Sequence, residues 1–553
     1  MPRFKKGLCL TSIFVACVVA EPMLQTTVSQ QKLVLTATTP STLRQIDTLV
    51  DRMVRNGELR LIAVASDTIL PDHQHERLAQ YHDGVQVFGA DVTRQTASGL
   101  TTSIFGQVYP NIDVGTIPTL SLENVRETLT LDHGFSDYLD STPDLMILKT
   151  ATGTFNLVHK LIASTSQGPR VLFVDANTGV TMWNYSAIQP NNEGLPCDTC
   201  AVGEGFGVKG DTKKISVRAM GGAFRTVDLL RPTRITTYDL DGDWVRLLWI
   251  LNNQTLFHES DIGRNTNNSW TDGAVVDAHV GAGWTYDYFY NRFGRRGLDG
   301  KDGPIVSVVH PVHRRDLSKV PSNIVSLFYL NAFYCGSCGA HGIVVYGEGL
   351  PPDANRPMID FFSGALDVVS HELTHAVTAN TSQLIYRNES GALNEAFSDI
   401  VGVSIEFFMA ESGRHKAEQA DYILGEDVFK AGGIRSLASP SSFGDPDHYS
   451  IRFLGSRDNG GVHTNSTIAG HAFYLAIEGG TNSTSGLSVT GVGSQNRALI
   501  ERAFYRAFTM LMPADATFSI ARSTTVQSAR DMFGPDHMVE RAIADAWTAV
   551  GVE

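Results

Sequence analysis

The chain has 553 residues, of which 42% are hydrophobic, and its formal net charge at pH 7 is −14. This length exceeds one ordinary core, so we expect a folded protein of two to four domains. A nucleic-acid-binding protein needs clustered lysine and arginine to neutralise phosphates, and no such excess occurs here. The composition therefore excludes nucleic acid as a partner.

The first residues follow the pattern of a secretory signal peptide, which we place at residues 1–20. Three basic residues precede an apolar run over residues 8–19, and small side chains precede an expected cut before Glu21. A membrane anchor is the first alternative, but the run is well short of the roughly 20 residues that cross a bilayer. A lipid anchor on Cys17 is the second, and Phe14 fits a lipoprotein cleavage box poorly. No other segment is apolar enough to span a membrane, so we expect a secreted protein.

Residues 21–195 have the pattern of two small α+β modules. We expect, in chain order, a helix over 41–56, alternating strands over 80–95, a helix near 122–131, and a hairpin over 170–185 that turns at 177–179. Residues 186–200 combine Pro, Gly and Asn without periodicity. That composition is typical of a loop open to proteolysis.

The remainder of the chain divides into two lobes with different patterns. Short strand-like runs dominate residues 196–363, and we expect one helix at 273–294 and strands at 213–220, 234–240, 305–310 and 324–330. A 3.6-residue period dominates residues 364–553, most clearly at 494–512 and 538–551. The predicted fold class is α+β, with a β-rich lobe before a mainly α-helical lobe.

The segment HELTH, at residues 371–375, is the strongest chemical signal. Apolar residues recur at helical spacing around it, so His371 and His375 lie one turn apart on the same helix face and can bind a single ion. Glu372 leaves the helix beside them and can reach water on that ion. Taken alone, the motif leaves a solvated charged helix face as the alternative.

A second acidic segment offers the third ligand that a zinc ion needs. Glu395 follows His375 by twenty residues, which leaves room for a turn and a return helix. Asp399 comes one turn later on the same face and is placed to accept the outer ring N–H of a liganding histidine. The two segments together favour a zinc site.

HELTH followed by NEAFSD resembles the thermolysin family of secreted zinc endopeptidases, and the resemblance covers residues 202–553. Further segments match in the same order, namely VGEGFGVKGD, VDAHVGAGWTYDYFYNRFG, YLNAFY, GDPDHYS and DNGGVHTNS. The resemblance implies a zinc cleft between the two lobes. It also implies that Glu372 takes a proton from the attacking water and later delivers it to the leaving amine.

The resemblance assigns roles to particular residues of this chain. The implied zinc ligands are His371, His375 and Glu395, with Asp399 and Asn394 contacting these ligands from outside. Tyr386 and His463 would donate to the oxyanion, and Asp458 would orient His463. Asn331, Ala332 and Arg435 would bind the substrate backbone. The pocket for the residue after the scissile bond would be lined by Ile359, Phe362, Val368, Leu424 and Ile434, so we expect cleavage before large apolar residues.

The family's calcium site is matched only in part. Asp367, Glu406, Asp421 and Glu426 fall at acidic positions of the family, whereas Ile423 occupies a position that is usually acidic. Fewer carboxylates supply less charge for two divalent ions. We therefore expect one structural Ca²⁺, with two as the upper limit.

Four cysteines would remain after signal cleavage, in two C-x-x-C pairs, Cys197 with Cys200 and Cys335 with Cys338. An exported protein favours disulfides over a tetrathiolate zinc site, and spacing alone leaves their connectivity open. A redox or second-metal role for the later pair, with His341 nearby, is a further alternative.

By the same resemblance, residues 21–195 are a propeptide that assists folding and inhibits the enzyme until cleavage between Ser186 and Pro196. The leading hypothesis is thus a secreted, monomeric zinc endopeptidase that acts on peptides and proteins. A zinc aminopeptidase is one alternative, but its glycine-rich exopeptidase motif is not found. Another is a binding or adhesion protein on an inactive protease scaffold, which predicts damage at Glu372, His463 or a zinc ligand, and none is damaged.

Overall fold

The computed structural model describes residues 32–121, 124–125, 143–150, 153–165, 168–186, 199–338, 342–350, 358–415 and 420–553. Several expectations lie outside these residues, namely the signal peptide, Cys17, Cys197, His341, most of the helix near 122–131 and most of the loop at 186–200. Across the described ranges, no helix combines the length and the apolar character that a membrane crossing requires.

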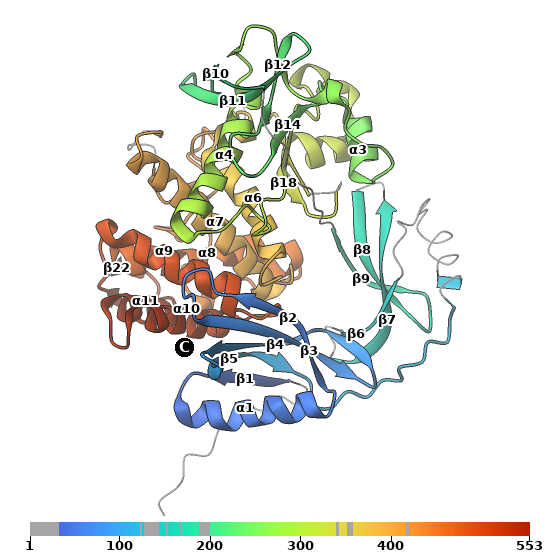
Figure 1. Cartoon of the computed structure of the whole chain (residues 1–553), viewed down its shortest axis with the longest axis vertical. Coiled ribbons are helices and arrows are strands. Elements are labelled where there is room, and N and C mark those ends of the chain that lie inside the picture. Colours follow the sequence, from blue (N-terminus) through green and yellow to red (C-terminus); the bar gives the residue numbers. More distant parts are fainter. Residues whose placement is uncertain are drawn as a thin grey trace, which may run out of the picture.

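The N-terminal region is built on one nine-stranded sheet, at the bottom and right of Figure 1. Its elements are β1 (Leu33–Ala37), α1 (Pro40–Arg55), β2 (Leu59–Ser66), β3 (His73–His82), β4 (Val85–Ala97), β5 (Leu100–Val108), β6 (Asp144–Lys149), β7 (Phe155–Thr165), β8 (Gly168–Asp175) and β9 (Thr181–Ser186). The two expected modules share this sheet because β4 pairs in parallel with β6.

The helix expected over 41–56 is α1, and local signals explain its position. The Thr39 side chain accepts the N–H of Thr42, and Pro40 occupies the first helical turn, where its missing N–H costs nothing. Val50 and Met53 are buried against the sheet. The helix thus covers one face of β1 to β5.

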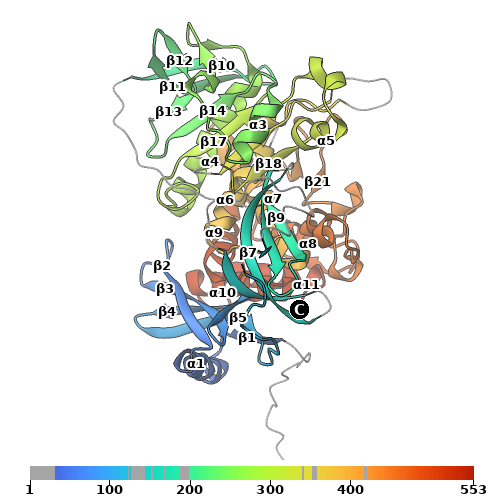
Figure 2. The ribbon, with the colours of Figure 1, turned by 90° about the vertical axis from the view of Figure 1, so that its right-hand side faces the viewer.

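The β-rich lobe contains two five-stranded sheets around one buried helix (Figure 2). One sheet has the order β15-β12-β11-β10-β16 and the other β13-β14-β17-β19-β18. The strands are β10 (Cys200–Phe206), β11 (Thr212–Met220), β12 (Ala223–Arg225), β13 (Val227–Asp228), β14 (Ile235–Asp239), β15 (Arg264–Asn265), β16 (Ser269–Trp270), β17 (Ile305–Val309), β18 (Ala332–Cys335) and β19 (Ile343–Tyr346). The helices and short helical turns are α3 (Trp244–Leu251), η1 (Glu259–Asp261), α4 (Gly273–Phe293), η2 (Arg314–Lys319), α5 (Ser322–Ile324) and η3 (Val325–Tyr329).

The expected helix at 273–294 is α4, the central helix of this lobe. The Asp272 side chain caps its start by accepting the N–H of Val275 at 3.2 Å, and Gly294 ends it in the left-handed conformation with φ 68°. Most of its residues are buried, because sheets and helices surround it. The helix therefore connects the β-rich lobe to the helices of the C-terminal lobe, against which it packs.

The strand expected at 324–330 is wrong, because this segment forms α5 and the π-helical turn η3. A short apolar run does not distinguish a buried strand from a buried helix turn. Pro321 stands at the N-cap of α5, and Phe328 and Tyr329 pack into the core between this turn and the sheet. Packing rather than local preference decides the conformation. The expected strands at 213–220, 234–240 and 305–310 are confirmed as β11, β14 and β17.

The C-terminal lobe is mainly helical, as expected, with α7 at its centre. Its helices and turns are η4 (Phe362–Gly364), α6 (Leu366–Ala379), α7 (Asn388–Glu411), η6 (Pro440–Phe443), η7 (Tyr449–Ile451), α8 (Asp458–Glu478), η8 (Ser494–Asn496), α9 (Arg497–Arg506), η9 (Ala507–Leu511), α10 (Phe518–Phe533) and α11 (Met538–Ala549). Its strands are β20 (Ile423–Leu424), β21 (Arg435–Ser436), β22 (Gly480–Thr481) and β23 (Ser488–Val489). Both α6 and α8 pack against α7, which brings three motif-bearing helices together.

The N-terminal region packs directly against the helical lobe, as Figure 1 shows for β2 to β5 and α10. The Arg506 guanidinium is fully buried and bonds Asp67 at 2.7 Å and Asp531 at 3.0 Å, so one arginine links carboxylates from both regions. An apolar contact lies beside it, formed by Phe105, Met510 and Leu511. A buried arginine is stable only when its charge is paired, so this contact is specific.

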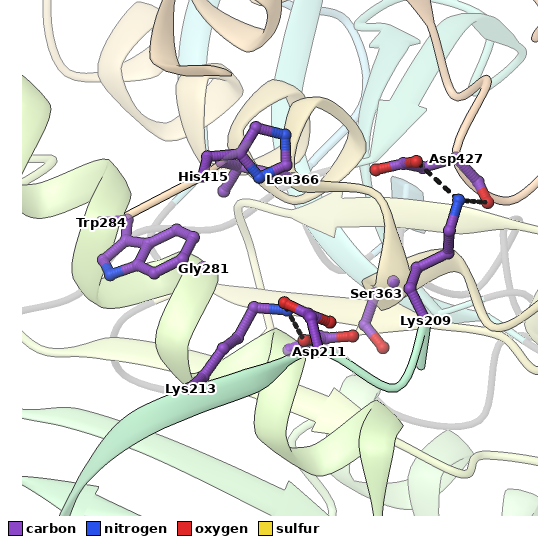
Figure 3. A pocket seen from close by; sticks show the side chains of 11 residues that line it. Lys209, Asp211, Lys213, Gly281, Trp284, Ser363, Leu366, His415 and Asp427 are labelled. Carbon is purple, nitrogen blue, oxygen red and sulfur yellow. Dashed lines mark hydrogen bonds and ion pairs between the residues drawn. The ribbon is translucent and has the colours of Figure 1, made fainter. Parts of the chain in front are cut away.

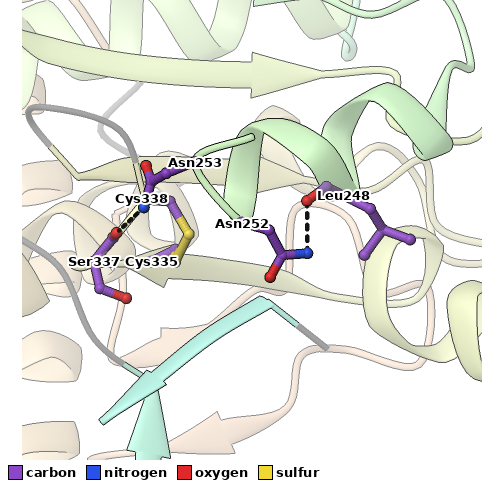
Figure 4. Close-up of a disulfide and its surroundings, with 6 residues drawn as sticks. All are labelled: Leu248, Asn252, Asn253, Cys335, Ser337 and Cys338. Carbon is purple, nitrogen blue, oxygen red and sulfur yellow. Dashed lines mark hydrogen bonds between the residues drawn. A yellow bond between two sulfur atoms is a disulfide. The ribbon is translucent and has the colours of Figure 1, made fainter. Parts of the chain in front are cut away.

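Cys335 and Cys338 form a local disulfide at the end of β18, with their Cα atoms 5.5 Å apart (Figure 4). This confirms the expectation of a disulfide over a tetrathiolate zinc site. The turn between them rests on the end of α3, where the Asn253 side chain donates to the Ser337 carbonyl at 3.4 Å. The disulfide thus braces the outer end of the edge strand.

Candidate active site

Helices α6 and α7 carry the zinc motif. The first carries His371, Glu372 and His375 on one face, and the second carries Glu395. The opposite face of α6 is anchored by the buried apolar side chains of Val369, Leu373 and Val377. The helical spacing predicted from the sequence therefore holds.

Three donor atoms converge between the helices. His371 Nε2 and His375 Nε2 lie 3.2 Å apart, and they lie 3.3 Å and 3.6 Å from the two carboxylate oxygens of Glu395. Glu395 is fully buried. Two imidazoles and one carboxylate at these separations form a ligand set that suits a tetrahedral Zn²⁺ with one open position.

The Nδ1 atoms of His371 and His375, which point away from Glu395, each face a hydrogen-bond acceptor. These contacts show whether the Nε2 atoms are free to bind an ion. His371 Nδ1 lies 2.8 Å from Asp399 Oδ1, and His375 Nδ1 lies 2.9 Å from Asn394 Oδ1. A neutral ring that donates from Nδ1 presents a lone pair at Nε2. Both lone pairs then point toward each other and toward Glu395, so a cation is needed between them. The donor set fits Zn²⁺.

Charges around the cluster hold its carboxylates ionised. Burial raises the pKa of Asp399, but Arg435 and His371 lower it to about 2. Arg435 bonds Asp399 through Nε at 2.9 Å and Nη2 at 2.7 Å. Burial lowers the pKa of His371, whereas Asp399 and Glu395 raise it to about 10, so a proton takes the place of the ion when none is bound. The site is therefore electrostatically balanced before it binds metal.

The start of α8 carries His463 to this cluster. Four consecutive residues, 458–461, have positive φ, and Gly460 and Gly461 occur where a Cβ atom would meet neighbouring atoms at 2.3 Å and 2.6 Å. After this turn, Asp458 accepts the backbone N–H of His463 at 2.9 Å and its ring Nδ1 at 2.7 Å. The carboxylate therefore caps the helix and contacts the ring at the same time, and the ring contact is the one that the resemblance implied for Asp458.

Tyr386 lies between His463 and the group formed by His371, His375 and Glu395, which is called the zinc cluster below. Its hydroxyl donates to Glu395 and lies 3.4 Å from His463 Nε2. The His463 side chain is half-exposed, at 47%. Its pKa is lowered by burial and raised by Glu395 and Asp458, with a net rise. Two donors thus face the open side of the cluster.

A pocket opens beside the cluster and gathers most of the predicted substrate residues. Its lining comes from β18, α6, β20 and the start of β21, and includes Asn331, Ala332, Phe362, Val368, His371, Glu372, Leu424, Phe429, Ile434, Arg435 and His463. Ile359 does not line this pocket, and its backbone forms an isolated antiparallel β-bridge with Phe429. Phe429 was not predicted, because it belongs to no motif and reaches the pocket only through the turn that follows β20.

The comparisons with known proteins agree with this geometry. Residues 202–379 match the family model described as thermolysin metallopeptidase, catalytic domain, and residues 382–552 match thermolysin metallopeptidase, alpha-helical domain. A bacillolysin from Brevibacillus brevis is 34% identical over 87% of this chain and 83% of its own length. A thermolysin from Bacillus sp. (strain EA1) is 33% identical over 89% of this chain and 86% of its own. The chain belongs to the thermolysin metallopeptidase family.

As a member of the thermolysin family, the chain is a zinc metalloendopeptidase, and the family uses catalytic Zn²⁺ and structural Ca²⁺. The matched share of the chain exceeds what residues 202–552 alone would give, so it includes much of the N-terminal region. Among solved structures, the precursor of protealysin from Serratia proteamaculans is 28% identical, with a TM-score of 0.43, and the match covers 58% of this chain and 87% of that chain.

A second group of acidic residues lies where the thermolysin resemblance expects calcium. Within the part of the chain that the structure describes, both carboxylate oxygens of Glu406 and both of Glu426 are buried without a hydrogen-bond partner from another residue. Asp367 is fully buried and accepts two backbone N–H groups, from Val368 and Gly425. Orphaned buried carboxylates indicate an oxygen-rich cation site, so the residues fit Ca²⁺.

Burial, and after it repulsion between the carboxylates, raises the pKa values in this acidic group. Burial raises the pKa of Asp367 to about 7 and that of Glu426 to about 9, with neighbouring carboxylates adding to both. Burial and the same neighbours raise the pKa of Glu406 well above its usual range. Asp421 shifts in the same direction, mainly through burial. A bound divalent ion would reverse this repulsion.

Two residues that were not predicted from the sequence, His415 and Asp427, also approach Glu406. The side chains of His415 and Asp427 place ligand atoms within 4.8 Å of those of Glu406 and of one another. Lys209 from the β-rich lobe bonds Asp427 at 2.7 Å, and Figure 3 shows this pair in one pocket with His415. Asp427 follows Glu426 directly in GEDVF, so its adjacency to a predicted ligand was the available signal.

Proposed function

We propose that the chain is a secreted, self-inhibited endopeptidase that cleaves peptide bonds before large apolar residues. The observation that carries the proposal is an apolar pocket that opens onto the buried His371, His375 and Glu395 cluster and also exposes Glu372. A zinc ion held by these three side chains would polarise the scissile carbonyl and acidify the attacking water. The other steps, which are proton transfer and stabilisation of the negative charge on the carbonyl oxygen, are assigned to side chains of the protein.

Glu372 is the proton carrier of the proposed reaction. It shares the pocket with His371, and its place beside the ligand set puts its carboxylate within reach of the attacking water. It takes the water proton during attack and gives it to the amine nitrogen as the peptide bond breaks. His463 Nε2 and the Tyr386 hydroxyl donate to the carbonyl oxygen as its negative charge develops.

The edge of β18 is proposed to bind the substrate backbone. The strand ends the order of its sheet, so its outer edge can accept an added extended chain. Asn331 and Ala332 at its start line the pocket. The Asn331 carbonyl is held by the N–H of Gly347 at 2.9 Å, which fixes this edge. Arg435 uses Nε and Nη2 for Asp399, so its proposed substrate contact falls to Nη1.

The pocket wall sets the proposed preference. Apolar side chains dominate it, namely Phe362, Val368, Leu424, Phe429 and Ile434. Burying a Leu, Ile or Phe side chain there stabilises the complex by about 1.5–3 kcal/mol. A peptide library should show cleavage before these residues, and a preference for charged residues at that position would contradict the assignment.

Substitution of Glu372 tests the mechanism. We expect Glu372→Gln to lower casein hydrolysis by about 10²- to 10⁴-fold, because proton transfer is lost, with zinc content unchanged. Glu411→Gln is the matched control, since Glu411 lies at the exposed end of α7. Hydrolysis by Glu372→Gln at the control rate would overturn the role of this residue.

We further propose that residues 21–195 act as the propeptide, both as intramolecular chaperone and as inhibitor. The hairpin of β8 and β9 contacts both lobes, because β8 packs on α3 while the Arg387 guanidinium lies 5.0 Å from the Trp183 ring on β9. Arg506 adds its buried pair with Asp67. Contacts to both lobes would hold the cleft closed to substrate.

Controlled maturation tests the inhibitor. Intact mass should show cleavage of the purified chain between residues 186 and 196, with casein hydrolysis rising in step. Asp67→Asn should release inhibition earlier, since it weakens the Arg506 contact. An uncleaved chain that hydrolyses casein as fast as the processed enzyme would rule out inhibition. Secretion and a monomeric state are part of the same proposal, and light scattering on the mature enzyme tests the latter.

A further inference from the structure

A second histidine cluster lies in the β-rich lobe and shares no residue with the zinc, calcium or substrate sites assigned above. His310 Nδ1 lies 2.6 Å and His313 Nδ1 lies 2.8 Å from the same oxygen, Oε1 of Glu348. Both His310 and Glu348 are buried, while the His313 side chain is 16% exposed. Three donor atoms of the kinds that bind zinc therefore meet at one point.

The fold explains why these residues meet. Strands β14, β17 and β19 run parallel to one another, so their carboxyl ends lie along the same edge of the sheet. His310 directly follows β17, Glu348 follows β19, and Asp241 follows β14. Ligands bind preferentially at the carboxyl ends of parallel strands, because the loops that follow converge there. This edge is such a position.

The outer nitrogens of both rings face carboxylates. His310 Nε2 lies 3.0 Å from Asp272, the N-cap of α4, and His313 Nε2 lies 2.7 Å from Asp241. The arrangement repeats that of the active site, where His371 turns one nitrogen to a shared carboxylate and the other to Asp399. Carboxylates behind histidine ligands are a regular feature of zinc sites.

The geometry of the two rings suits an ion at the shared point. All four ring nitrogens face carboxylate oxygens, and the ring centroids lie 5.4 Å apart. A neutral imidazole that donates from one nitrogen presents a lone pair at the other. Each ring could therefore bind an ion through Nδ1 while its Nε2 donates to the carboxylate behind it.

We propose that His310, His313 and Glu348 bind a second Zn²⁺, which ties together the ends of β14, β17 and β19. Glu348 is already oriented for this role, because Oε2 accepts the N–H of Arg314 at 2.9 Å. The adjacent Gly347 and Gly349 donate to the Asn331 and Tyr329 carbonyls. The ion thus braces the segment that holds the edge of β18. Asp241 is 83% exposed, so the site opens to solvent on the side of His313.

Zinc stoichiometry tests the proposal independently of proteolysis. The full chain carrying Glu372→Gln, which prevents self-cleavage, is titrated with Zn²⁺ in calcium-containing buffer and its bound zinc is measured by mass spectrometry. We expect two ions per chain, one in His313→Ala and two in His258→Ala, an exposed control histidine. One ion in all three chains would overturn the proposal.

A second background separates this site from the catalytic one. In His371→Ala the catalytic ligand set is incomplete, so the ion that remains must be held elsewhere. We expect one zinc ion in this chain and none when His313→Ala is added, with thermal melting confirming that each variant is folded. Absence of zinc from folded His371→Ala would refute the second site, whereas loss of only the catalytic ion supports it.

Discussion

The zinc cluster and the acidic group are both buried and rich in acceptors, yet their electrostatics are opposite. Around His371, the chain supplies its own cations, and the pKa of Asp399 falls to about 2. Around Glu406, carboxylates face carboxylates, and the pKa of Glu426 rises to about 9. The first site is ready to bind its ion, whereas the second is strained until an ion arrives. We therefore expect zinc loss to stop catalysis and calcium loss to lower the stability of the enzyme.

The largest expected effect is the loss of kcat when the oxyanion donor His463 is replaced. His463→Ala should lower kcat by about 10²- to 10³-fold, because one oxyanion donor is lost. The side chain is half-exposed and is not one of the zinc ligands, so melting temperature and zinc content should change little. Steady-state kinetics beside His258→Ala checks this. A variant with normal kcat would remove His463 from the reaction.

Calcium removal probes the acidic group. At an ion concentration 100 times Kd, a bound ion stabilises the folded state by about 2.7 kcal/mol, and a calcium-selective chelator should remove this stabilisation. Thermal unfolding of the Glu372→Gln chain with and without chelator measures it. Glu406→Gln should respond less to chelator, because the site has lost a buried carboxylate. An unchanged melting temperature in chelator would exclude a structural calcium ion.

A smaller effect is expected from substitution of Asp399, which contacts the zinc ligand His371 on the side away from the ion. Asp399→Asn should weaken zinc binding by about 10- to 100-fold, because His371 loses the charge that orients it. Competition with a zinc chelator measures the affinity, and melting curves report separately on the cost of leaving Arg435 unpaired. Zinc affinity equal to that of the unaltered chain would show that the ligands alone determine it.

The smallest expected effect is a pH dependence confined to the calcium-free protein. Asp367 and Glu426 have folded pKa values of about 7 and about 9, above those of unfolded carboxylates. The folded state then binds more protons, so stability falls as pH rises from about 6 to 9. Lowering pH across this range in chelator should raise the melting temperature by about 2–4 °C per kcal/mol recovered. Glu426→Gln should flatten the profile, and a rise of the same size in saturating calcium would contradict its origin in the acidic group.

Much of the active site could be predicted because its residues lie at helical spacing within short segments. His371, Glu372 and His375 share one turn of α6, and Glu395 with Asp399 share one turn of α7. Local periodicity decides such relations, so a motif is sufficient to predict them. The turn 458–461 was not predicted, although its consecutive glycines were an available signal of a backbone conformation that other residues avoid.

Other relations depend on chain segments far apart in sequence. Arg435 pairs with Asp399, and Phe429 enters the pocket wall, only because α7 and the turn after β20 pack together. The segment 324–330 was expected to be a strand and is helical, because burial of Phe328 and Tyr329 outweighs their local preference. No periodicity within a single segment carries this information.

By itself, the sequence determined the family, the metal-binding helices and the division into a β-rich and a helical lobe, because each depends on residues within one or two turns of each other. The tertiary structure decided which charges meet. It buried Glu406 among other carboxylates and gave Asp399 an arginine. It also brought His310, His313 and Glu348 to one edge of a parallel sheet, because strand order, rather than sequence distance, decides which loops converge.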